Sequence, residues 1–345
     1  MAKTDTHTFY KSVGGIQMSF GTRKSSPLVW DFGYVAEPKR TDAEQAAHHM
    51  AVAEMPRFAI QGKSLSADEN IKEAMLTSLW KHQHVVDANG FAYPGTHQIT
   101  GSCVGAAYGN VIVTLACVEA ITRGEPEQAL IPFWLLAYGR SRYYLGSRSP
   151  GSGSTGSTMA KAAREDGDVE ARRSGLPLFT NSDGLVWGKS AELAWSDGDA
   201  QQTMALLPEA RRHLVQTTAQ CANHNDVKEA IINGYPCTAA SMYAHDGGKV
   251  QGTPPVLLAK RRGQWSHQMS ILNWILHPQF GDLFWLHNQW GLGAHGIDPY
   301  GGPAGGVWIT AADVDYICRD EAFAYSNRQG YPAPAPSGPI PWVYA

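Results

Sequence analysis

Cysteine is scarce in this chain of 345 residues. The five cysteines stand at positions 103, 117, 221, 237 and 318, and none of them forms a Cys-x-x-Cys pair. An odd number of cysteines at this low density favours reduced thiols over a disulfide framework.

Charge and long apolar runs are also limited. Charged residues make up 17% of the chain and the net charge is −3, without a long basic run, which argues against nucleic acid or an anionic membrane as partner. The first residues contain no apolar leader, and the longest apolar stretch, residues 111–121, is shorter than the roughly 20 residues that span a bilayer. We therefore expect a cytoplasmic protein.

Apolar residues at 43% indicate a globular protein with a sizeable core, in one large or two medium domains. Residues 1–85 form an N-terminal extension with two predicted helices. The first covers residues 41–55 and ends before Pro56. The second covers residues 66–81, where Ser66 and Glu69 form a capping box and Ile71, Met75 and Leu79 recur at helical spacing.

Helices predominate early in the rest of the chain and strands later, which predicts the α+β class. Residues 166–220 are polar and ambiguous, and resemble an insertion. The predicted helices cover residues 103–123, 128–142 (starting or kinking near Pro132), 157–165 and 226–234, and the predicted strands cover 235–243, 256–259, 267–276, 282–286 and 306–310.

Two segments are rich in glycine or proline. Residues 146–156 are rich in Gly and Ser, a composition typical of a flexible linker. Residues 331–345 alternate proline with small and aromatic residues and favour a polyproline-II tail. This tail is either a surface strap packed on its own domain or an arm that binds a partner.

Three chemically active residues carry the functional signal. Cys103 stands at the predicted start of an apolar helix, where the helix dipole favours a thiolate. His267 lies 164 residues after Cys103, at the start of a predicted strand. Asn288 lies 21 residues after His267, just past the end of another predicted strand. A thiol nucleophile, an imidazole that takes its proton and an amide that orients the imidazole together describe nucleophilic acyl transfer. The other cysteines are interpreted as small buried residues.

The order of Gly-Ser-Cys103, His267-Gln-Met-Ser and Asn288-Gln-Trp290-Gly resembles papain-like cysteine peptidases, over residues 86–325. The resemblance is to disulfide-free members from bacteria and bacteriophages. It implies a helical lobe, about residues 95–220, beside a β-barrel lobe, about residues 221–330, with the active-site cleft between them. The catalytic domain would then be residues 86–330.

The resemblance also assigns roles to further residues. The oxyanion donor would be Gln98, or His97, because Gln98 is one position closer to Cys103 than the family's glutamine. Trp290 would shield the bond between His267 and Asn288. The Gly-rich run would form an edge of the cleft, where Gly151, Gly153 and Gly156 let a peptide backbone approach. No metal or other cofactor is implied, and the other histidines lack ligand spacing.

Three functions stay open from the sequence. The first is a cysteine endopeptidase that acts on peptides or proteins through a thioester acyl-enzyme. The second is another thiol acyl-transfer enzyme, such as an amidase or a transglutaminase-like enzyme, because fold does not fix function. The third is a structural or assembly protein, for example one associated with a virion, that joins a larger assembly through the N-terminal extension and the Pro-rich tail.

Overall fold

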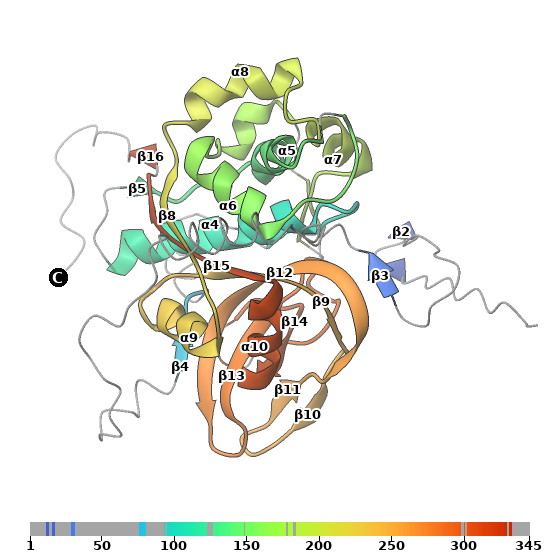
Figure 1. Ribbon diagram of the computed structural model, residues 1–345, viewed down its shortest axis with the longest axis vertical. Helices are drawn as coiled ribbons and strands as arrows, with labels where there is room; N and C mark the ends of the chain where they lie inside the picture. The colour runs from blue at the N-terminus through green and yellow to red at the C-terminus, as the bar shows by residue number, and fades with distance from the viewer. Residues whose placement is uncertain are drawn as a thin grey trace, which may run out of the picture.

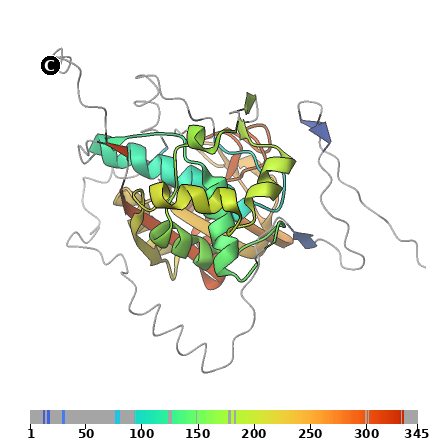
Figure 2. The ribbon, with the colours of Figure 1, turned by 90° about the horizontal axis from the view of Figure 1, so that it is seen from above.

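The computed structural model describes residues 12–13, 16–17, 29–31, 76–80, 93, 95–122, 127–147, 149–176, 179–181, 184–297, 300, 302–329 and 331–332. A group of helices lies on one side of the molecule and a large sheet on the other, with one long helix, α4, between them (Figure 1). The view from above shows the helices covering this side of the sheet (Figure 2). The α+β class predicted from the sequence is confirmed.

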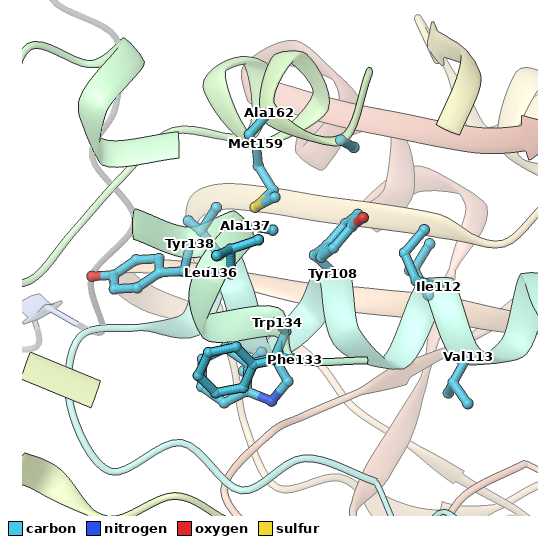
Figure 3. Packing of buried hydrophobic residues seen from close by; sticks show 14 of the residues in the cluster. Tyr108, Ile112, Val113, Phe133, Trp134, Leu136, Ala137, Tyr138, Met159 and Ala162 are labelled. Atoms are coloured by element: carbon cyan, nitrogen blue, oxygen red, sulfur yellow. The ribbon is translucent and has the colours of Figure 1, made fainter. Parts of the chain in front are cut away.

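The central helix α4 (Cys103–Thr122) begins at the candidate nucleophile, as predicted. Its sequence is apolar on all sides, so a stable position requires neighbours all around it. Tyr108 and Ile112 pack against α5 (Trp134–Tyr144) and α6 (Gly156–Glu165) in one buried cluster (Figure 3). By length and composition the stretch Cys103–Ile121 could cross a membrane, but most of it is buried inside the protein, as in the core helix of a globular domain.

In the helical lobe, α5 begins at Trp134, just after Pro132, which is one of the two positions that the proline allowed for this helix. Another region of this lobe differs from the sequence prediction. The polar region 166–220, for which no elements were predicted, contains regular structure. It comprises the 3-10 helix η1 (Ala171–Ser174), β6 (Phe179–Asn181), β7 (Gly184–Val186), α7 (Lys189–Trp195), α8 (Gln201–Ala210) and β8 (Val215–Gln220).

The large sheet has ten described strands, eight of them in the order β10-β11-β14-β13-β12-β9-β15-β8. These described strands form an open mixed sheet, so the term β-barrel describes this lobe only loosely. The strands are β8, β9 (Cys237–His245), β10 (Lys249–Gln251), β11 (Val256–Leu258), β12 (Arg261–His277), β13 (Gly281–His287), β14 (Gly306–Thr310), β15 (Glu321–Arg328) and, beside β12, β3 (Val29–Asp31) and β4 (Leu76–Ser78).

Two helices pack on the sheet. Helix α9 (His224–Ile232) is followed by Gly234 at positive φ, close to the predicted range. Helix α10 (Ala311–Asp320) was missed, although Thr310 and Asp313 form a capping box at its start. The described remainder consists of two short strand pairs, β1 (Ser12–Val13) with β2 (Ile16–Gln17) and β5 (Glu127–Gln128) with β16 (Tyr331–Pro332).

The N-terminal extension contributes two strands to this sheet. Strand β4 pairs with the end of β12, so the helix predicted over residues 66–81 is wrong at residues 76–78. Tertiary pairing with β12 outweighs the helical spacing of Met75 and Leu79. Strand β3 runs parallel to β12, with Asp31 opposite Ser266. The helix predicted over residues 41–55 and residues 333–345 of the Pro-rich tail lie outside the described residues.

Deleting the N-terminal extension is expected to destabilise the protein. A chain that starts at residue 86 loses the buried side chains of Leu79 and Trp80, and also the hydrogen bond from Ser78 Oγ to Asn273 Oδ1. Burial of two such side chains contributes about 1.5–3 kcal/mol each. Urea unfolding of the truncated and full chains measures the difference. A truncated chain that is equally stable and more active would show that the extension inhibits the protein and does not support it.

Candidate active site

The loop before Cys103 is held by one buried carboxylate from α7. Glu192 accepts hydrogen bonds from the backbone N–H groups of Ile99 and Thr100, both at 2.8 Å. It also accepts from the Thr100 and Ser102 hydroxyls, at 2.6 and 2.7 Å. Burial raises the pKa of Glu192, and these hydrogen bonds oppose that shift. The carboxylate therefore fixes the path of the chain into α4.

His267 lies on β12, where the strand is irregular. The pairing between β12 and β9 shifts register between Arg261 and Gln264, and again between Gln264 and His267. Such bulges turn side chains out of the regular alternation and are common beside active sites. The next residue, Gln268, donates its backbone N–H to Cys103 Sγ at 3.4 Å. Standard backbone geometry then places the His267 Cα within about 6 Å of that sulfur.

The His267 ring is enclosed by Asn288 and two tryptophans. Its Nε2 lies 2.9 Å from Asn288 Oδ1. The Trp290 ring is stacked on the imidazole, with centroids 5.1 Å apart and 22° between the planes, and the Trp265 ring meets it edge-on at 5.3 Å. The structure thus brings together Cys103, His267, Asn288 and Trp290, which are far apart in the sequence.

Burial governs the charge of His267. Neither His267 nor Cys103 has any exposed surface. Burial lowers the pKa of His267 to about 3, because the charged imidazolium loses its hydration, while the bond to Asn288 acts in the opposite direction. In this closed arrangement the neutral imidazole is favoured, which is the form that can accept a proton from a thiol.

Both candidate oxyanion donors lie beside the Asn288 loop. The backbone N–H of Gln98 donates to Gln289 O at 2.9 Å, and His97 pairs with Trp290 in an isolated bridge. The side-chain amide of Gln98 donates to Thr100 O at 2.9 Å, two residues away in the same loop. One of its two N–H groups is therefore occupied within the protein, and the assignment of the oxyanion donor to Gln98 or His97 stays a prediction.

The Gly-rich run is held by hydrogen bonds to other parts of the protein and is not a free linker. The guanidinium of Arg142 donates to Gly153 O at 2.8 Å, and the Gly153 N–H donates to Gly101 O at 2.9 Å. Gly151 donates its N–H to Ser196 Oγ, and Gly156 donates its N–H to Glu321 Oε2. The expected cleft edge requires these three glycines to offer their N–H groups to an extended peptide. In this conformation the three N–H groups are already bonded within the protein.

The glycines serve close packing instead. A Cβ at residue 151 would lie 2.8 Å from an Arg142 nitrogen, and a Cβ at residue 156 would lie 2.9 Å from Glu321 Oε2. A side chain at either position would therefore require the neighbouring charged group to shift.

Three residues of this site were missed from the sequence. Glu192 lies in the ambiguous region 166–220, Gln268 acts through its backbone, and His295 lies in the loop between β13 and β14. His295 Nε2 is 2.9 Å from Asn288 Nδ2, on the side of the amide opposite to His267. The spacing Asn288…His295 was the only available signal, and no known motif marks it. Among the described residues, no group of three His, Cys, Asp or Glu could hold a metal ion.

Comparison with solved structures identifies the fold. The chain is similar to xylellain, a cysteine protease from Xylella fastidiosa, with a TM-score of 0.50 and 15% identity over 85% of this chain and 96% of that chain. It is also similar to digestive procathepsin L 3 of Tenebrio molitor (TM-score 0.46, 11% identity, 86% and 83% covered). The chain is also similar to bromelain from Ananas comosus, with a TM-score of 0.42 and 11% identity over 73% of this chain and 98% of that chain. No family model and no curated protein matches the sequence.

The likeness to xylellain shows that this chain has the fold of the papain-like cysteine proteases. At 15% identity it supports a cysteine protease at the level of the fold only.

Proposed function

We propose that this papain-like chain is a cysteine peptidase in which Cys103 is the nucleophile, His267 the general base and Asn288 the group that orients the base. One observation carries the proposal. The nucleophile candidate at the start of α4 receives a hydrogen bond from the residue next to His267, and His267 in turn contacts Asn288.

The geometry suits the formation of an acyl-enzyme. Asn288 Oδ1 accepts a hydrogen bond from His267 Nε2–H, so the Nδ1 lone pair is left to take the thiol proton. The Cys103 sulfur then attacks the peptide carbonyl carbon, and the C–N bond breaks as the imidazolium returns its proton to the leaving amine. The α4 N-terminus and the N–H of Gln268 stabilise the developing thiolate.

Hydrolysis of the thioester repeats these steps with water. His267 Nδ1 takes a proton from water as the oxygen attacks the acyl carbon, and the proton then passes to the departing sulfur. Trp290, stacked on the imidazole, keeps bulk water from the bond between His267 and Asn288. Cys103 and His267 have no exposed surface, so a substrate reaches them only after neighbouring chain segments move.

A labelling experiment tests this proposal. We expect a thiol-reactive epoxide to modify Cys103 at neutral pH and to spare Cys117, Cys221, Cys237 and Cys318. Burial raises the pKa of Cys237 and Cys318, so these thiols are poor nucleophiles. Mass spectrometry of tryptic peptides locates the adduct. Equal modification of all five thiols under native conditions, or none at Cys103, would contradict the proposal.

An unbiased peptide library separates the remaining possibilities. Cuts within peptides support an endopeptidase, whereas release of ammonia or transfer to an added amine without cuts indicates another acyl-transfer reaction. Labelling of Cys103 without any turnover would favour the structural or assembly role.

A further inference from the structure

Asn288 has a partner on each side of its amide. Oδ1 lies 2.9 Å from His267 Nε2, and Nδ2 lies 2.9 Å from His295 Nε2. An amide nitrogen only donates hydrogen bonds, and an amide oxygen only accepts them. The protons on the two histidines and the orientation of the amide are therefore linked.

Two arrangements satisfy all three side chains. In the first, His267 carries a proton on Nε2 and donates to Oδ1, while Nδ2 donates to the bare Nε2 of neutral His295. In the second, the amide is turned over, His295 donates to Oδ1, and Nδ2 donates to the bare Nε2 of His267. Only the first arrangement leaves Nδ1 of a neutral His267 without a proton.

We propose that His295 is a positioning residue, which as a neutral imidazole selects the orientation of Asn288 that makes His267 a base. This inference rests on the proposed function. Protonated His295 carries a hydrogen on both ring nitrogens and has no acceptor for Nδ2. Protonation therefore turns the amide over, moves the His267 proton to Nδ1 and removes the base from the reaction.

The surroundings of His295 fit this role. The side chain is partly exposed, so it exchanges protons with solvent, whereas His267 is fully buried. His295 faces His267 on β12 and His287 on β13. A positive charge on His295 lowers the pKa of both of these histidines. Its Nδ1 also approaches Gly247, next to Asp246, whose carboxylate accepts from the backbone of Gly248 and Lys260. Its ring centroid is 5.8 Å from that of Trp290.

Activity against pH is the first measurement. The variant His295→Gln keeps an oxygen that accepts from Nδ2 but cannot be protonated, and His295→Leu has no acceptor. We expect His295→Leu to reduce kcat/KM about tenfold at neutral pH, the effect of one lost hydrogen bond. His295→Gln should retain activity at neutral pH and shift the acid limb of the profile to lower pH. His224→Gln is the control. It removes a different partly buried histidine, which lies on α9, and should leave the pH profile unchanged.

The second measurement does not depend on turnover. Long-range proton–nitrogen NMR of the protein with labelled histidines reports which nitrogen of His267 carries the proton. We expect Nε2–H at neutral pH in the wild type, conversion to Nδ1–H as His295 is protonated, and no such pH-dependent conversion in His295→Gln, whose amide does not titrate. Comparison with a His267→Gln variant assigns the signal among the 13 histidines.

The outcomes separate the two proposals. If the wild type cleaves peptides but His295→Gln keeps the wild-type acid limb, the role of His295 is wrong and the peptidase proposal stands. An Nε2–H signal that persists in the wild type while His295 titrates overturns the role as well. If no substrate is turned over and the NMR behaves as expected, the positioning role holds and the peptidase proposal fails.

Discussion

Replacing Cys103 by alanine is expected to abolish peptide hydrolysis and leave the fold intact. The substitution removes the sulfur atom that the proposed mechanism requires for the acyl bond, so kcat/KM should fall by at least about 10⁴-fold, as when a triad nucleophile is lost. Alanine fits the first turn of α4, and the loss of one buried sulfur should cost about 1–2 kcal/mol of folding free energy. Assays with a cleaved library peptide, together with circular dichroism, measure both effects.

Cys117→Ala provides the matched control. Cys117 is equally buried and lies in the same helix, so its loss should change stability to a similar extent. The peptide hydrolysis by Cys117→Ala should remain at the wild-type level. Wild-type turnover in Cys103→Ala would mean that another residue is the nucleophile.

Stability is expected to fall steeply as the pH is lowered below about 6.5. Burial lowers the pKa of His245 to about 4 and the pKa of His267 and His287 to about 3. In the unfolded chain these groups titrate near 6.5, so the unfolded state binds more protons between pH 6.5 and those lower values. Each histidine then removes up to about 1.4 kcal/mol per pH unit, or about 4 kcal/mol for three.

Urea unfolding at pH 7.0, 6.0 and 5.0 measures this slope. Burial raises the pKa of Glu192 and Asp320, which acts in the opposite direction, so the comparison of variants is more informative than the total. His245→Gln removes one of the three groups without touching Cys103, His267 or Asn288. Its slope should be smaller than that of the wild type by up to about 1.4 kcal/mol per pH unit. Identical slopes would show that His245 is not buried as a neutral group.

Much of the fold could be predicted because apolar periodicity and local signals agree with the tertiary structure. Helix α4 starts at Cys103 and β14 occupies residues 306–310, as expected. The strand over 267–276 was also expected, but β12 begins earlier, at Arg261. Its first four residues are exposed and polar, so no apolar alternation marks them.

Other features depend on contacts between distant segments and have no local signal. Strand β4 forms because β12 provides an unpaired edge, which the helical spacing around Leu79 does not reveal. The candidate site shows the same division. Residue type and order indicated Cys103, His267 and Asn288, whereas Glu192 and His295 are recognisable only from the hydrogen bonds that the fold creates.

The Glu192 carboxylate holds the loop before the candidate nucleophile through contacts that do not depend on redox conditions. All five cysteines are free, and none of them lies among residues 99–102. The four hydrogen bonds to Glu192 hold residues 99–102 without any bond that a thiol reagent could break. A reducing medium therefore keeps the Cys103 thiol intact and does not loosen the loop that carries it.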